Sequence, residues 1–134
     1  MRSRPCRLSE EIGASTVELL AFFPLLMAII LLTVQVSFNW YGQEVATTAA
    51  REAARIVRTG GGSAESIAQA RQTTPDYARN VGGQALEDVA VSIQVNGEEV
   101  EVTVSGRPRD VFAGLSPDVS ATVSSPIEEF RSDQ

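Results

Sequence analysis

Histidine and lysine are absent from this chain of 134 residues, and cysteine and tryptophan each occur once. Without histidine there is no Ser–His–Asp or Cys–His pair, no histidine general base and no imidazole ligand for a metal. Cys6 alone cannot build a disulfide framework or a zinc site made of thiolates. We therefore expect no enzyme, no cofactor and no metal centre, and the composition favours a structural or interaction protein.

Basic residues are also few, because the 11 arginines face 17 acidic residues and the formal net charge is -6. Non-specific binding of nucleic acid needs a basic surface that neutralises phosphates. The length allows one modest domain and leaves no room for a substrate domain beside a cofactor domain. We expect neither a nucleic-acid partner nor a small-molecule substrate.

A long uncharged segment lies near the N-terminus. No charged residue occurs from Leu19 to Gln43, and 16 of the 20 residues from Leu19 to Phe38 are apolar. A helix of about 20 such residues spans roughly 30 Å, the thickness of the hydrocarbon core of a bilayer. Trp40 and Tyr41 follow at the position where aromatic side chains favour the membrane interface. The segment therefore predicts one transmembrane helix at about residues 19–38, with membrane lipid as its partner.

Three other interpretations of this segment fit less well. A buried helix of a soluble protein needs a core on every side, and the rest of the chain is too small and polar to surround it. A secretory signal peptide has a shorter apolar region, of about 7 to 15 residues, which ends at a small-residue cleavage site. Lipoprotein processing requires a cysteine after the apolar region, whereas Cys6 precedes it.

Arginines flank the apolar segment on both sides. They are Arg2, Arg4 and Arg7 before it and Arg51, Arg55 and Arg58 after it. The two sides therefore carry equal numbers of arginines, and the count alone does not determine the orientation. The preceding arginines lie closer to the segment, and Glu44 and Glu52 partly offset the following ones. We expect the N-terminus in the cytoplasm and the C-terminal region outside.

Glu18 stands at the start of the apolar segment, five residues after Gly13. A carboxylate within a membrane costs on the order of a few kcal/mol unless it is paired or interfacial. If a peptidase cuts after Gly13, the new α-ammonium of Ala14 lies one helical turn from Glu18 of its own or a neighbouring chain. Alternatively, Glu18 marks the interfacial end of a permanent anchor, where the helix dipole favours an acidic residue. The spacing alone leaves both interpretations open.

The N-terminal pattern resembles that of a known family. A basic leader ending in glycine, a glutamate at the fifth mature position and a long apolar helix are similar to the class III signal of type IV pilins and pseudopilins. More specifically, Gly13–Leu26 (GASTVELLAFFPLL) resembles the start of TadE-like proteins of the tight-adherence (Flp) pilus system. Ala49–Arg55 (AAREAAR) resembles the small-residue and paired-arginine segment that follows the anchor in that family.

This resemblance implies processing and a role in pilus assembly. In the family a prepilin peptidase removes the leader, here residues 1–13, so that cleavage falls between Gly13 and Ala14. The product acts as a minor pseudopilin, and Glu18 is expected to set the assembly register. The implied partners are the prepilin peptidase, other pilins or pseudopilins, and the Tad assembly machinery. The implied location is the cytoplasmic (inner) membrane and, after processing, the pilus.

A second function comes from a different class. The chain could act as a permanently membrane-anchored, non-polymerising interaction protein of a secretion or envelope complex. Blocking cleavage after Gly13 discriminates between the two functions, because it would impair a pseudopilin and leave an anchor unaffected.

The helix is predicted to continue beyond the membrane as far as Thr59, before three consecutive glycines. Arg51, Arg55 and Arg58 follow i, i+4, i+7 spacing and share one face, which is either solvated or a helix-packing or partner face. Alanines at positions 46, 49, 50, 53 and 54 offer a slim surface that another helix can approach closely.

A small mixed domain is predicted after the glycines. Ser63 is a candidate N-cap for a helix over residues 64–72, and Thr74-Pro75-Asp76 either interrupts it or starts another helical piece. Alternation over 89–95 and 100–104, separated by Asn96-Gly97, predicts a β-hairpin with a two-residue turn. Residues 119–124 predict a third strand. We expect the second helix or the upper part of the first to cover the apolar face of the hairpin.

Glu98, Glu99 and Glu101 beside the hairpin turn are a weak candidate for a divalent-cation site. Carboxylates next to a turn are more often solvated. The three glycines lack the lysine and the strand-to-helix context of a phosphate-binding loop.

The predicted fold class is therefore α+β. A long, pilin-like N-terminal transmembrane helix extends into a small exoplasmic domain with a short helix and a three-stranded antiparallel sheet. The expected divisions are a cytoplasmic leader at 1–13, a long helix at 14–59, a glycine linker at 60–63, the domain at 64–126 and a tail at 127–134.

Overall fold

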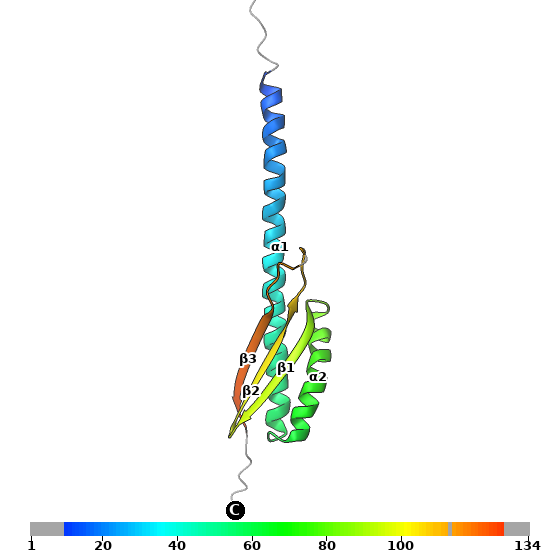
Figure 1. Ribbon diagram of the computed structural model, residues 1–134, viewed down its shortest axis with the longest axis vertical. Coiled ribbons are helices and arrows are strands. Elements are labelled where there is room, and N and C mark those ends of the chain that lie inside the picture. The colour runs from blue at the N-terminus through cyan, green and yellow to red at the C-terminus, as the bar shows by residue number, and fades with distance from the viewer. Residues whose placement is uncertain (1–9, 113, 128–134) are drawn as a thin grey trace, which may run out of the picture. The chain divides into compact units, whose positions relative to one another are not determined.

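The computed structural model describes residues 10–112 and 114–127, with side chains from residue 16 onward. Two helices and three strands follow one another along the chain (Figure 1). They are α1 (Glu10–Thr59), α2 (Ala64–Gly82), β1 (Leu86–Asn96), β2 (Glu99–Pro108) and β3 (Val119–Pro126). The fold is α+β, as the sequence predicts. The chain divides into two compact units, with the boundary inside α1 between Val34 and Gln35.

The N-terminal unit consists of α1 as far as Val34. Every side chain from Thr16 to Ile30 is exposed, including those of six leucines and isoleucines. Among the described residues, α1 is the one helix that is long and apolar enough to cross a membrane. Pro24 lies within it and the helix continues on both sides, as membrane helices tolerate. So much exposed apolar surface is unfavourable in water, so this unit requires lipid or another apolar partner.

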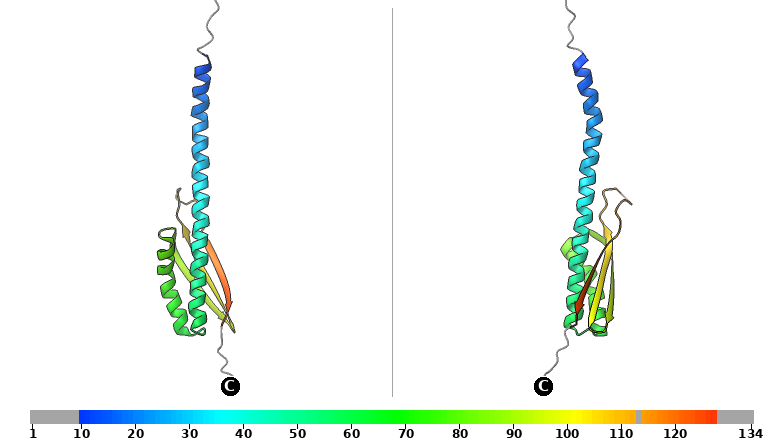
Figure 2. Two further views of the ribbon diagram at one scale, coloured as in Figure 1. Left: turned by 180° about the vertical axis from the view of Figure 1, so that it is seen from behind. Right: turned by 90° about the vertical axis from the view of Figure 1, so that its left-hand side faces the viewer.

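The C-terminal unit contains α1 from Gln35 onward, α2 and an antiparallel sheet of order β1-β2-β3. Within it, α1 and α2 lie side by side on one face of the sheet (Figures 1 and 2). This confirms the expectation that helices cover the apolar face of the hairpin. The opposite face is polar, because alternate residues of β2 such as Glu99, Glu101 and Arg107 point to solvent.

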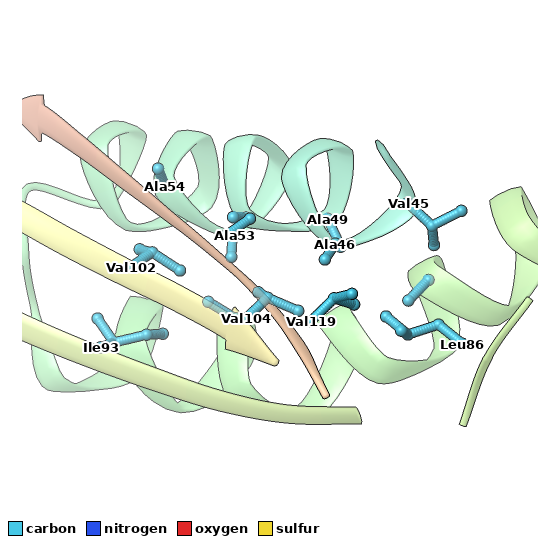
Figure 3. Packing of buried hydrophobic residues seen from close by; sticks show 14 of the residues in the cluster. Val45, Ala46, Ala49, Ala53, Ala54, Leu86, Ile93, Val102, Val104 and Val119 are labelled. Carbon is cyan, nitrogen blue, oxygen red and sulfur yellow. The ribbon is translucent and has the colours of Figure 1, made fainter. Parts of the chain in front are cut away.

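Small residues of α1 pack against the valines of β2 to form the core. Buried α1 residues recur at three- and four-residue intervals, as expected for one helix face, at positions 46, 49, 50, 53, 54 and 57. Val100, Val102 and Val104 are completely buried, and Val102 and Val104 face the alanines in Figure 3. The alanine surface that could receive a helix of another chain is therefore covered by the chain's own domain.

Helix α2 passes through Pro75 without a break, so the predicted interruption at residues 74–76 is wrong. A proline inside a helix removes one backbone hydrogen bond and costs about 3 kcal/mol. The same helix buries Ala70, Thr74 and Ala78, which recur at four-residue spacing on one face. Packing of this face against the domain core maintains the helix where local propensity favours a break.

The hairpin turn lies one residue later than predicted. Asn96 pairs with Glu99 across the two strands, so the turn consists of Gly97 and Glu98. Gly97 has φ of 64°, which suits the first turn position of a type II′ hairpin. In this register Val95, Ile93 and Val91 lie opposite Val100, Val102 and Val104, so apolar residues of the two strands share one face.

Residues 60–63, three glycines and a serine, connect the two helices. Helix α1 ends at Thr59, where the glycines begin, and Gly61 and Gly62 both adopt positive φ. The Gly62 amide donates to the Val57 carbonyl at 2.9 Å and closes the end of α1. Ser63 is the N-cap of α2, since its hydroxyl accepts from the Ser66 amide at 3.2 Å.

Candidate membrane and assembly sites

The predicted cleavage site lies inside a helix. Helix α1 begins at Glu10, so Gly13 and Ala14 both precede the apolar segment within its first turns. Glu18 is exposed and lies four residues after Ala14, a rise of about 6 Å. A peptidase that cuts between Gly13 and Ala14 must unwind this first turn, because cleavage requires access to an extended backbone. Of the predicted leader at residues 1–13, residues 1–9 lie outside the part of the chain that the structure describes.

Polar groups within the apolar segment are satisfied by the protein itself. The Thr33 hydroxyl donates to the carbonyl of Ile29 at 2.8 Å, one turn earlier in the helix. Such back-bonding allows a hydroxyl to lie in a medium that offers no water. Thr33 is therefore compatible with a membrane environment.

Gln35, which also lies in the apolar segment, holds the loop between β2 and β3. Its side-chain amide donates to Asp110 Oδ1 at 3.2 Å and to the Ser116 hydroxyl. Its carbonyl oxygen accepts from the Val111 amide at 2.9 Å. Both ends of the amide are thus used, and α1 is joined to a loop about 75 residues later in the chain. We call these contacts the Gln35 clasp.

Asp110 is the polar centre of this loop. Its second carboxylate oxygen accepts from the Gly114 amide at 3.0 Å. Hydrogen bonds from Ser116 first, and then from Gly114 and Gln35, lower the pKa of Asp110 below its ordinary value, because they stabilise the ionised carboxylate. The loop is therefore folded around a charged group that four donors surround.

Aromatic side chains follow the apolar segment on α1. Trp40 is 75 % exposed and Tyr41 is 48 % exposed. An exposed indole and phenol just past an apolar helix are typical of the membrane interface.

The three arginines predicted to share a face lie together in the structure. With Val123 and Ser125 of β3 they line a groove of about 280 Å³. Arg51 and Arg55 are exposed, whereas Arg58 is half-buried and donates to the Ser125 hydroxyl at 3.2 Å. Strand β3 therefore covers one end of this arginine face.

The charge of the arginine face is partly neutralised within α1. Arg55 donates to both carboxylate oxygens of Glu52, at 3.0 and 2.7 Å. The hydrogen bonds from Arg55 lower the pKa of Glu52, and the same pair raises the pKa of Arg55. The face thus offers less positive charge to a partner than its three arginines suggest.

The acidic cluster at the hairpin has the geometry of a solvated surface. Glu98 lies in the turn, Glu99 and Glu101 lie on the open face of β2, and all three are exposed. Within residues 10–112 and 114–127, no group of three His, Cys, Asp or Glu side chains is placed to hold a metal ion.

Sequence reasoning did not identify Gln35 or its loop. The available signal was a side chain with two donors and an acceptor inside an otherwise apolar segment, which needs partners when water is excluded. The identity of those partners required the tertiary structure.

Within the described residues, one exposed apolar helix long enough to cross a membrane precedes a small α+β domain, which is the arrangement of a single-pass membrane protein. The family model described as TadE-like protein matches residues 13–55. This match confirms the resemblance inferred from the motifs, and the segment that contains Gly13, Glu18, the apolar helix, Arg51 and Arg55 is TadE-like. No curated protein and no solved structure matched the chain.

Proposed function

We propose that this chain is a minor pseudopilin that takes part in assembly of a tight-adherence (Flp) pilus. The main support for the proposal is that the TadE-like match at residues 13–55 contains the fully exposed apolar part of α1. A helix exposed on all sides can exchange a lipid environment for the helices of neighbouring subunits. This exchange is what assembly from a membrane requires.

In this account the apolar segment at about 19–38 holds the precursor in the cytoplasmic (inner) membrane, with the N-terminus inside and the domain outside. A prepilin peptidase removes residues 1–13, and the assembly machinery then extracts the processed chain. Packing against the helices of other pilins or pseudopilins buries the apolar surface again. The arrangement of exposed side chains supports packing through residues 16–30, because α1 from Val45 to Val57 is covered on one face by its own domain.

Glu18 gives such packing a defined axial register. A carboxylate at the centre of an apolar assembly costs about 2.5–3.5 kcal/mol when unpaired, as it does in a membrane. The α-ammonium of Ala14 on a neighbouring subunit removes this penalty, since two opposite charges about 4 Å apart attract by roughly 4 kcal/mol at an effective dielectric constant near 20. In a subunit shifted by one helical turn, Glu18 has no ion pair and the full desolvation cost of its carboxylate remains.

Glu18→Ala tests the proposal, with Glu44→Ala as the matched control. Both residues are exposed carboxylates on α1, but Glu44 lies beyond the apolar segment. We expect both variants to fractionate with membranes, and we expect only Glu18→Ala to be strongly depleted from sheared pili. Normal incorporation of Glu18→Ala into pili would refute the role of Glu18 in register.

Gly13→Val separates the proposed function from that of a permanent anchor. A branched side chain at the predicted cleavage position should block processing, so we expect the precursor to accumulate in the membrane and pilus assembly to fall. An anchor that acts without polymerising would retain its interactions in this variant.

A further inference from the structure

The Gln35 clasp places one loop of the domain at a defined height along α1. Gln35 donates to Asp110 and Ser116 and accepts from Val111, so residues on both sides of the loop are held. Because three hydrogen bonds join the loop to a single residue of a helix, the loop can shift little along the helix axis.

That height corresponds to the edge of the apolar segment. Gln35 lies three residues before Phe38, where the apolar window ends, and five residues before Trp40. At the rise of an α-helix these separations are about 4.5 and 7.5 Å. If Trp40 lies in the interface, the clasped loop lies level with the boundary between head groups and acyl chains. This step rests on the membrane anchoring in the proposed function.

The loop carries apolar side chains that the domain does not cover. Beyond Tyr41, the described residues include five exposed large apolar side chains, and three of them belong to this loop: Val111 at 37 %, Phe112 at 42 % and Leu115 at 69 %. The other two, Val81 and Val95, lie on α2 and at the end of β1. Apolar exposure on the domain is therefore concentrated at the level of Gln35.

Three backbone amides of the loop donate hydrogen bonds within the domain. The Gly114 amide donates to Asp110, the Leu115 amide donates to the Phe112 carbonyl at 3.2 Å, and the Val111 amide donates to Gln35. Gly114 has φ of 88°, which allows the chain to turn back on itself. Paired amides and exposed apolar side chains suit this loop to the membrane interface, where the ionised Asp110 keeps its hydrogen-bond donors and need not enter the hydrocarbon core.

We propose that this loop is a second membrane contact of the protein. Val111, Phe112 and Leu115 insert into the lipid interface beside α1, and the Gln35 clasp fixes their depth. Lipid is the occupant because the loop is bonded to Gln35, only five residues before Trp40 on the same helix, and exposed tryptophan at the end of an apolar segment is typical of the membrane interface. The domain is thus held to the bilayer at two points, the helix and the loop.

Tryptophan fluorescence in vesicles of phosphatidylcholine and phosphatidylglycerol tests this proposal. In the full chain with Trp40→Phe as background, single reporters are placed at Phe112→Trp, at Ile30→Trp within the apolar segment, and at Val95→Trp. Val95 is the matched control, because it is as exposed as Val111 but lies beside Gly62, past the far end of α1. From Gln35 to that end the helix rises about 36 Å.

We expect lipids brominated near the head group to quench the reporter at position 112 several-fold more than the one at position 95. Aqueous acrylamide should show the opposite order, and lipids brominated deep in the acyl chains should quench position 30 most. Leu115→Trp provides a second loop reporter should position 112 disturb the loop. Gln35→Leu, which retains an apolar helix but removes the clasp, should reduce lipid quenching at both loop positions.

Two outcomes would overturn the loop contact while leaving the anchor intact. In the first outcome, lipids quench the reporter at position 30, but acrylamide quenches the loop reporters as strongly as the reporter at position 95. The other is loop shielding that rises with protein density in the vesicles, which would assign the loop to contact with a second copy. Absence of lipid quenching at position 30 itself would instead refute the membrane anchoring in the proposed function, and the loop contact with it.

Discussion

Replacing Ala50 by leucine distinguishes a core position from an assembly surface. Ala50 lies in the middle of the covered part of α1 and is 0 % exposed. Leucine adds three carbon atoms at this position. If there were room, burying them would stabilise the fold by about 0.8 kcal/mol for each methylene. Ala50 belongs to the alanine row of α1, the buried alanines at 46, 49, 50, 53 and 54, which lie in one core cluster with the valines of β2. Because this core is closely packed, the added atoms must displace neighbours, which typically costs 1–3 kcal/mol.

Ala68→Leu is the matched control for this substitution. Ala68 lies inside α2 and is exposed, so the same change in side chain meets solvent there. Leucine is almost as good a helix former as alanine, and surface substitutions of this kind usually change stability by less than about 0.5 kcal/mol. The difference between the two variants therefore isolates the packing of the alanine row.

Hydrogen exchange of the β2 amides in detergent micelles measures both effects in the full chain. These amides report opening of the domain, whereas the membrane helix need not unfold. We expect the opening free energy to fall by 1–3 kcal/mol in Ala50→Leu and to stay near the wild-type value in Ala68→Leu. Unchanged β2 protection in Ala50→Leu, together with loss of incorporation into pili, would show that the alanine row faces another subunit.

Two further predictions concern the loop and the contact between the helices. The pKa of Asp110 is lowered in the folded chain, so its ionised form stabilises the loop above the ordinary value of 3.8, and this contribution is lost as the pH falls through the lower folded pKa. We therefore expect hydrogen exchange of the Gly114 amide, corrected for its intrinsic rate, to accelerate in acid. Asp110→Asn should abolish this pH dependence. If the dependence persists in Asp110→Asn, another group is responsible for it. A Cβ atom on Gly82 would lie 2.7 Å from Val45 Cγ2, so Gly82→Ala should lower the opening free energy by about 1–3 kcal/mol. The penalty should shrink in the Val45→Ala background in a double-mutant cycle, and equal penalties in both backgrounds would show that the two residues do not touch.

The sequence was sufficient to predict the fold class because its strongest patterns agree with one another. Alternation on either side of Gly97 predicts the hairpin, and the glycines after Thr59 predict the end of the long helix. Each of these signals is local, since a few neighbouring residues determine the backbone conformation. The position of the turn depended on which valines face each other across the strands, and for that reason the prediction missed it by one residue.

Tertiary packing explains the features that the sequence did not reveal. Pro75 favours a break, yet α2 continues because Ala70, Thr74 and Ala78 pack against the domain core. The alanines of α1 suit any close neighbour, and only the fold shows that the neighbour is the chain's own sheet. The Gln35 clasp joins residues about 75 positions apart, so no local pattern could predict it.

The roles of the candidate assembly residues depend on other proteins as well as on the fold of this chain. Gly13, Ala14 and Glu18 were selected by their spacing and by resemblance to a family, and their roles depend on a peptidase and on neighbouring subunits. The arginine face formed by Arg51, Arg55 and Arg58 lies where the helical spacing puts it. Its use by a partner remains a prediction.

The mass of the intact chain recovered from sheared pili tests the central claim most directly. If the chain is a processed pseudopilin, the pilus fraction contains a species that begins at Ala14 and lacks residues 1–13, while the longer species beginning at Met1 stays in the membrane fraction. Recovery of the Met1 species in assembled pili, or absence of the chain from pili while it is abundant in the membrane, would contradict the account.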